Sequence, residues 1–125
     1  MNTQGKNKIL LIEPPFYRLF HDKYSLNKYP LSLGYLAGTI RKHTEWDVMV
    51  YNADFMPKSV SMRISHLSGA GFTNYRNTLK NASASIWDEV RTTILNYRPN
   101  VVGITSKTPN FESASIVARI AKEID

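Results

Sequence analysis

Three short apolar runs stand out along the chain, each bounded by polar or turn-forming residues. They cover residues 8–12 (KILLI), 46–52 (WDVMVYN) and 101–105 (VVGIT). Nearly continuous apolar runs of this length are typical of strands that are covered on both faces in a parallel sheet. We therefore predict three buried strands. Pro14 and Pro15 end the first, because proline has no N–H for a sheet ladder.

The segments between and after these runs have the hydrophobic period of helices. Apolar residues recur at intervals of three, four and seven, which places them on one face of each helix. The three sets are Leu33, Leu36, Ala37 and Ile40; Ile86, Val90, Ile94 and Tyr97; and Val117, Ile120, Ala121 and Ile124. Residues 55–81 show no sustained period, and we expect a long loop with a broken helix there.

Local signals mark where two of these helices begin. Pro30 suits the first turn of the first helix, and Thr108 or Asn110 is expected to cap the last helix with its side chain. Gly34 and Gly38 lie four residues apart in the first helix. Each costs helix stability unless a close approach of the backbone to the sheet or to a ligand needs the space.

The alternation of strands and helices predicts a doubly wound α/β domain with a parallel sheet and right-handed crossovers. The sequence ends at Asp125, where this pattern calls for a fourth strand. We expect residues 1–125 to be the N-terminal part of a single α/β domain in a longer protein. The third strand would then be an exposed apolar edge, through which we expect self-association.

Composition narrows the class of protein. Of the 125 residues, 42% are hydrophobic and 21% charged, which fits one globular domain. The net charge is +6, but the basic residues are spread from Lys6 to Lys122 without the cluster that binds nucleic acid, so no nucleic-acid partner is predicted. No stretch resembles a secretory signal or a membrane span, which favours a cytoplasmic protein. The chain has no cysteine and therefore no thiolate ligand for zinc or an iron–sulfur cluster.

In an open parallel sheet, ligands bind beyond the carboxyl ends of the strands. Residues 13–16, 54–55 and 105–108 follow the three predicted strands and are expected to meet there. The first exit contains neither a Gly-x-Gly-x-x-Gly motif nor a phosphate-binding loop, so a nucleotide is not favoured. Pro14 and Pro15, with Phe16 beside them, instead suggest a rigid support for a broad, flat, largely apolar ligand.

Some residues at this edge allow two interpretations. Glu13 and Asp54 end adjacent strands and could act as an acid/base pair, although capping of turns or helix ends is the simpler role. A dense group of aromatic residues could cover the end of the sheet or line a ligand. Its members are Phe16, Tyr17, Phe20, Tyr24 and Tyr29.

Neither a metal site nor a catalytic residue is predicted. His21, His43 and His66 have no metal-ligand spacing. Ser106 and Ser113 have no histidine and acid in an order that would indicate a nucleophilic serine.

Four segments together resemble the N-terminal cobalamin-binding domain of cobalamin-dependent radical SAM enzymes. They are residues 8–15 (KILLIEPP), 29–37 (YPLSLGYLA), 51–54 (YNAD) and 98–106 (RPNVVGITS). This group includes enzymes of the anaerobic magnesium-protoporphyrin IX monomethyl ester cyclase type and many methyltransferases. The resemblance covers nearly the whole chain outside residues 55–81.

The resemblance implies a three-layer, flavodoxin-like sheet of order 2-1-3-4-5, truncated here to 2-1-3, with the corrin ring across the carboxyl edge. The implied cofactor-binding positions follow the strands or open the first helix: Pro14, Pro15, Phe16, Leu31, Ser32, Asp54, Thr105 and Ser106. The chain lacks the Asp-x-His-x-x-Gly motif that supplies an axial histidine in other cobalamin domains. His21 lies in the corresponding loop but outside that pattern, so bound cobalamin would have no protein histidine ligand.

The radical chemistry that the resemblance implies belongs to the parent protein. The Cys-x-x-x-Cys-x-x-Cys motif for a 4Fe–4S cluster is absent from these residues. S-adenosylmethionine and the cluster would therefore be held by a C-terminal radical SAM domain of the same chain. That domain would carry out methyl transfer or oxidative cyclisation.

Two other functions also fit an α/β pattern. A cofactor-free regulatory or interaction module of the receiver type would need an aspartate after the third strand and an acidic pair after the first. After its third strand this chain has Thr105 and Ser106, and after its first strand it has a single acidic residue, Glu13. The N-terminal half of a glycosyltransferase would need a nucleotide-sugar domain downstream.

Overall fold

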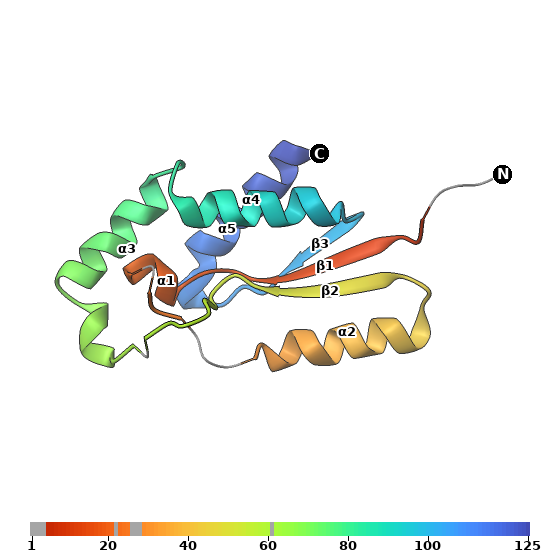
Figure 1. Ribbon diagram of the computed structural model, residues 1–125, viewed down its shortest axis with the longest axis horizontal. Coiled ribbons are helices and arrows are strands. Elements are labelled where there is room, and N and C mark those ends of the chain that lie inside the picture. Colours follow the sequence, from red (N-terminus) through yellow and green to blue (C-terminus); the bar gives the residue numbers. More distant parts are fainter. Residues whose placement is uncertain (1–4, 22, 26–28, 61) are drawn as a thin grey trace.

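The computed structural model describes residues 5–21, 23–25, 29–60 and 62–125. Within these ranges the chain forms a small sheet, helices on both of its faces, and a helical segment beyond one end (Figure 1). The strands are β1 (Lys8–Glu13), β2 (Asp47–Asn52) and β3 (Val101–Ile104). The helices are α1 (Tyr17–Phe20), α2 (Leu31–His43), α3 (Ala70–Lys80), α4 (Ser85–Tyr97) and α5 (Phe111–Ile124), with 3-10 turns η1 (Ile64–Leu67) and η2 (Thr108–Asn110).

The sheet confirms the predicted fold class. Its strand order is β2-β1-β3, and both pairings are parallel. Helix α2 lies on one face, whereas α4 and α5 lie on the other, as in a flavodoxin-like α/β fold (Figure 1). Each strand lies within one residue of its predicted bounds.

The main core lies between the sheet and the helices α4 and α5. Alternate residues of β1 face it, and Leu10 and Ile12 are fully buried there. The helical period places the apolar face of α4 and α5 on the same core. The other buried members are Leu19, Ala53, Ile86, Trp87, Val90, Ile94, Val117 and Ile120.

The opposite face of the sheet has a thinner cover. Leu11 of β1 and Leu33 of α2 are buried, but Tyr35 and Leu36 of the same helix are largely exposed. A Cβ at Gly34 would lie 2.6 Å from the Cε1 atom of Tyr29, so this glycine admits a close contact with a loop ring and not with the sheet. A Cβ at Gly38 would meet nothing within 4 Å, and nothing in the structure explains that glycine.

The helix ends differ from prediction in two places. Pro30 is the N-cap of α2 and not a residue of its first turn. At α5, Asn110 occupies the N-cap position but makes no side-chain cap; its Oδ1 atom accepts the N–H of Lys107 at 2.7 Å instead. Thr108 opens the 3-10 turn η2, which leads directly into α5, so neither side chain caps the helix as predicted.

The described part of residues 55–81, for which we predicted a long loop with a broken helix, contains more regular structure than expected. It contains η1 and then α3, an unbroken helix of 11 residues. No residue of α3 is fully buried, because the helix packs on one side only, against α1 and the start of α5. Phe72, Tyr75 and Leu79 do have helical spacing, but the helix is otherwise mostly polar and follows a stretch of serine and glycine residues, so the sequence did not reveal it.

Candidate functional site

The exits of the three strands converge on one edge of the sheet. Glu13 pairs with Asn52 in the parallel register, and Ile12 pairs with Ile104. Neighbouring strands lie about 4.8 Å apart, so the three exits fall within roughly 10 Å of each other. The convergence on which the ligand-site prediction depends is therefore present. The helices α1 and α3 also lie at this carboxyl edge (Figure 1).

The residues predicted to bind a ligand divide into a buried and an exposed group. Pro14, Pro15 and Asp54 are buried, whereas Leu31, Ser32 and Ser106 are exposed. Phe16 and Thr105 are half-buried. The exposed members come from the start of α2 and the loop after β3, and these two segments supply the accessible surface of the edge.

Pro14 and Pro15 are buried directly after the end of β1. Both are nearly inaccessible, and the carbonyl oxygen of Pro15 accepts a buried hydrogen bond of 2.6 Å from the Ser113 hydroxyl of α5. This bond ties the exit of β1 to the first turn of α5. Proline suits this buried position because it has no backbone N–H, so only its carbonyl group needs a hydrogen-bond partner.

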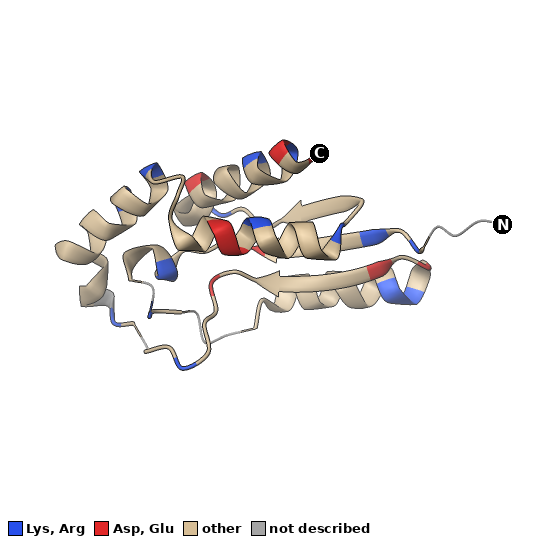
Figure 2. Ribbon diagram, turned by 45° about the horizontal axis from the view of Figure 1, so that its top comes forward, with Lys and Arg blue, Asp and Glu red and all other residues tan. Residues whose placement is uncertain are grey.

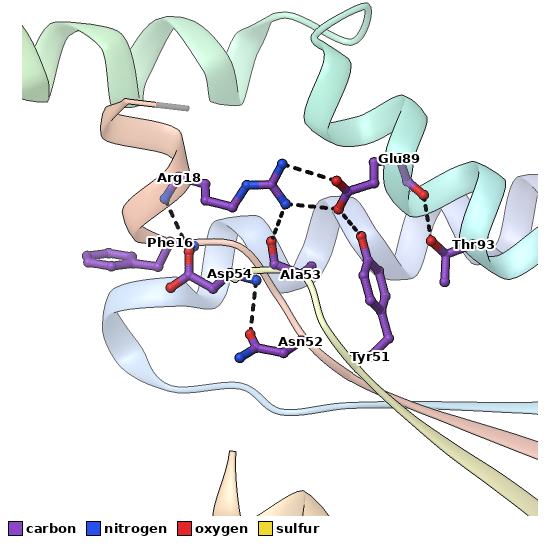
Figure 3. Close-up of polar contacts among 8 residues, drawn as sticks. All are labelled: Phe16, Arg18, Tyr51, Asn52, Ala53, Asp54, Glu89 and Thr93. Atoms are coloured by element: carbon purple, nitrogen blue, oxygen red, sulfur yellow. Dashed lines mark hydrogen bonds and ion pairs between the residues drawn. The ribbon is translucent and has the colours of Figure 1, made fainter. Parts of the chain in front are cut away.

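Asp54 holds the start of α1 against the exit of β2. Its Oδ1 atom accepts the N–H groups of Phe16 at 2.8 Å and of Arg18 at 3.1 Å (Figure 3). Desolvation by burial raises the pKa of Asp54 to about 6, against the lowering effect of these backbone hydrogen bonds. In the structure this carboxylate caps a helix, which is the simpler of its two predicted roles.

Glu13 has its own partners on the other side of the edge. Its carboxylate is buried, accepts a hydrogen bond from the Thr105 hydroxyl, and lies 4.0 Å from the Nζ atom of Lys107. Glu13 thus joins the exits of β1 and β3, while Asp54 joins that of β2 to α1. Each carboxylate has a structural role of its own in this arrangement.

A buried arginine beside Asp54 forms a network that the sequence did not indicate. The Arg18 guanidinium donates to the Ala53 carbonyl at 2.9 Å and to both carboxylate oxygens of Glu89 at 2.9 and 3.1 Å (Figure 3). The Tyr51 hydroxyl donates to the same carboxylate. Burial, with the Glu89 carboxylate as a further cause, raises the pKa of Tyr51 above its usual range. The network fastens α1, the end of β2 and α4 together.

Most of the aromatic group covers the end of the sheet. Phe20 is buried and its ring stacks on Tyr75 of α3 with centroids 4.7 Å apart. The Phe16 ring contacts those of Tyr17, Phe20 and Tyr75 edge-on. Tyr29 differs, because it is 65% exposed beside the start of α2. Tyr75 was missed as a partner because it lies in residues 55–81, where no helix was recognised, and is more than 50 positions from Phe20 in the sequence.

Two of the three histidines contact the same tyrosine ring, and the third lies on α2. His21 follows α1 and contacts the Tyr24 ring, which also stacks on His66 at 5.1 Å. His43 is in the last turn of α2. Within the part of the chain that the structure describes, no three histidine, aspartate or glutamate side chains are grouped as a metal site.

Basic residues are distributed over helices, loops and strand ends, and acidic residues lie among them (Figure 2). None of the described helices has the length and apolarity to cross a bilayer.

Comparison of the chain with protein-family models, with curated proteins and with solved structures finds no match.

Proposed function

We propose that this chain is a cobalamin-binding module that holds the corrin ring over the carboxyl edge of its parallel sheet. The observation that supports this most directly is the convergence of the three strand exits beside the exposed start of α2. In open parallel sheets this is where ligands bind. The four segments that resemble cobalamin-binding domains of radical SAM enzymes include all three exits and the start of α2.

The chemistry of the exposed edge suits a large amphipathic ring. Leu31 is 62% exposed and Tyr29 is 65% exposed, so this edge presents apolar side chains to a ligand. The hydroxyl groups of Ser32 and Ser106 lie at the same edge and are exposed. Apolar side chains would support the face of a corrin, and hydroxyl groups would bind its peripheral amides.

We propose that the corrin binds without a cobalt ligand from a histidine of this chain, because the sequence lacks the Asp-x-His-x-x-Gly motif. His43 lies at the far end of α2 from Leu31, and His21 and His66 are both in contact with Tyr24. The chemistry that the cofactor supplies, carrying a methyl group or an electron for a radical SAM domain, would belong to the parent protein and not to these residues.

The proposal is tested by gel filtration of the chain with hydroxocobalamin, recording corrin absorbance in the protein peak. We expect co-elution at high micromolar protein, and its loss in Ser32→Trp with Ser106→Trp. Glu45→Trp is the control, because Glu45 is exposed and lies just before the start of β2, at the opposite end of the sheet. No corrin in the peak of the unaltered chain, or equal loss in the control, would contradict the proposal.

One observation favours a second candidate, a cofactor-free interaction module. Among the described strands, β3 pairs with β1 alone, so its outer backbone groups are unpaired. Beside this edge is a hollow of about 900 Å³ whose apolar wall includes Val102, Ile104 and Ala121. We propose that two copies pair through these edges. Light scattering at high concentration should then give a dimer mass, which Val102→Lys abolishes; a monomer mass throughout would oppose it.

A further inference from the structure

A second groove lies between α3 and the first half of α5. It has a volume of about 450 Å³, and its apolar lining comes from both helices. Leu79 and Ile116 contribute to it, and Phe72 and Phe111 remain 46% and 61% exposed. Two phenylalanines so exposed on adjacent helices form an apolar surface that nothing in the described chain covers.

The charged residues of the groove are mostly basic. Arg76 and Lys80 line it from α3 and Arg119 from α5, against the single acidic residue Glu112. No carboxylate from residues 5–21, 23–25, 29–60 or 62–125 lies within 4.0 Å of these three cations. The apolar surface is therefore bordered by three cations without counter-ions, which complements an apolar ligand that carries negative charge.

The length of the groove fits a helix. On α3 it extends from Phe72 to Lys80, and on α5 from Phe111 to Arg119. At 1.5 Å per residue, eight steps correspond to about 12 Å, or roughly two helical turns. This is the length covered by the i, i+3, i+4 and i+7 side chains of an amphipathic helix, the usual anchors for a helix in a groove.

We propose that the α3–α5 groove binds an acidic amphipathic helix of a partner protein. The apolar anchors of that helix lie against Phe72, Leu79 and Ile116, and its carboxylates lie toward Arg76 and Arg119. The surface includes none of the residues assigned to cobalamin, so binding here does not depend on the cofactor.

The probe is a fluorescein-labelled 16-residue peptide with leucine at helical i, i+3, i+4 and i+7 positions and glutamate on its flanks. Its binding to the full chain is followed by fluorescence anisotropy. A peptide with lysine at each glutamate position is the matched ligand control. We expect saturable binding of the acidic peptide, at least tenfold tighter than that of the basic one, and weaker at 300 mM than at 50 mM salt.

Variants then locate the binding surface. Arg76→Glu with Arg119→Glu should weaken binding about tenfold, because two favourable rim contacts become repulsive. Lys6→Glu with Lys42→Glu changes the net charge equally on exposed residues outside the groove and should leave affinity unchanged. Phe111→Gln removes an exposed apolar side chain of the groove and should weaken binding of the acidic peptide. Circular dichroism checks that this variant remains folded.

Three results would overturn the proposal. One is equal affinity for the acidic and basic peptides, and another is an equal loss in both double variants. The third is binding to phosphatidylserine vesicles with none to the acidic peptide, which would identify a membrane surface instead. A change in corrin binding is not expected in any of these variants, so failure here is distinguishable from failure of the proposed function.

Discussion

Replacement of Asp54 by asparagine should change how the stability of the domain depends on pH. Asp54 is 2% exposed, and burial raises its pKa from 3.8 to about 6. Below pH 3.8 the carboxyl group is protonated in both the folded and the unfolded chain. Between pH 3.8 and 6 the unfolded chain loses this proton first, so the folded state becomes less stable as pH rises.

The size of the effect follows from the shift. A rise of roughly two pKa units corresponds to about 3 kcal/mol of folding free energy, lost by the unaltered chain as pH rises through 6. Asparagine does not titrate, and its side-chain oxygen can still accept the N–H groups of Phe16 and Arg18. The unfolding free energy of Asp54→Asn minus that of the unaltered chain should therefore increase by about 2 kcal/mol between pH 4 and pH 7.5, the rest of the change lying below pH 4.

Urea unfolding, followed by fluorescence of the buried Trp87, measures this difference at each pH. Taking the difference between two chains cancels the titration of all other groups. Asp54→Ala is the control for geometry: it also removes the titration, but should lie about 1–2 kcal/mol below Asp54→Asn at every pH, because two N–H donors lose their acceptor. A difference between Asp54→Asn and the unaltered chain that stays flat from pH 4 to 7.5 would refute the argument.

Other substitutions test the contacts that shape the edge. The Arg18 guanidinium is more buried than the Glu89 carboxylate, 5% against 42% side-chain exposure. Glu89→Ala leaves a buried cation without its partner and should destabilise the fold by about 3 kcal/mol. Arg18→Met leaves a carboxylate that is still in contact with water and should destabilise it by about half as much. Equal losses of unfolding free energy in urea would contradict this difference. Ser113→Ala removes the hydroxyl that donates to Pro15 and should cost about 1–2 kcal/mol. Thermal unfolding of Ser113→Ala without a change in midpoint would show that this bond contributes nothing.

The sequence was sufficient for the sheet because its central strand, β1, is covered on both faces, although β2 and β3 are only half-buried and not the buried strands that we predicted. Residues such as Leu10, Leu11 and Ile12 are buried whichever face they point to, so the run is apolar without interruption. Parallel order then follows from the intervening helices. Because parallel strands end at the same edge of a sheet, the exits of β1 and β3 could be placed together.

The network around Arg18 could not be predicted, because its members are far apart in the chain. Glu89 is 71 residues from Arg18, and in the sequence both look like ordinary surface charges. Helix α3 was missed for a different reason. Its few apolar residues, such as Phe72 and Tyr75, have helical spacing but stand among polar residues and after a run of serines and glycines, so the segment does not stand out as a helix.

Amide chemical shifts of the isotopically labelled chain during titration with hydroxocobalamin test the central proposal most directly. Cobalt(III) is diamagnetic in this form, so the shifts report proximity of the ring. We predict saturable shifts for Leu31, Ser32 and Ser106 at the carboxyl edge, and none for Asp47 or Val101 at the opposite ends of their strands. Absence of shifts at the carboxyl edge, or shifts confined to the amino ends of the strands, would contradict a corrin site at this edge.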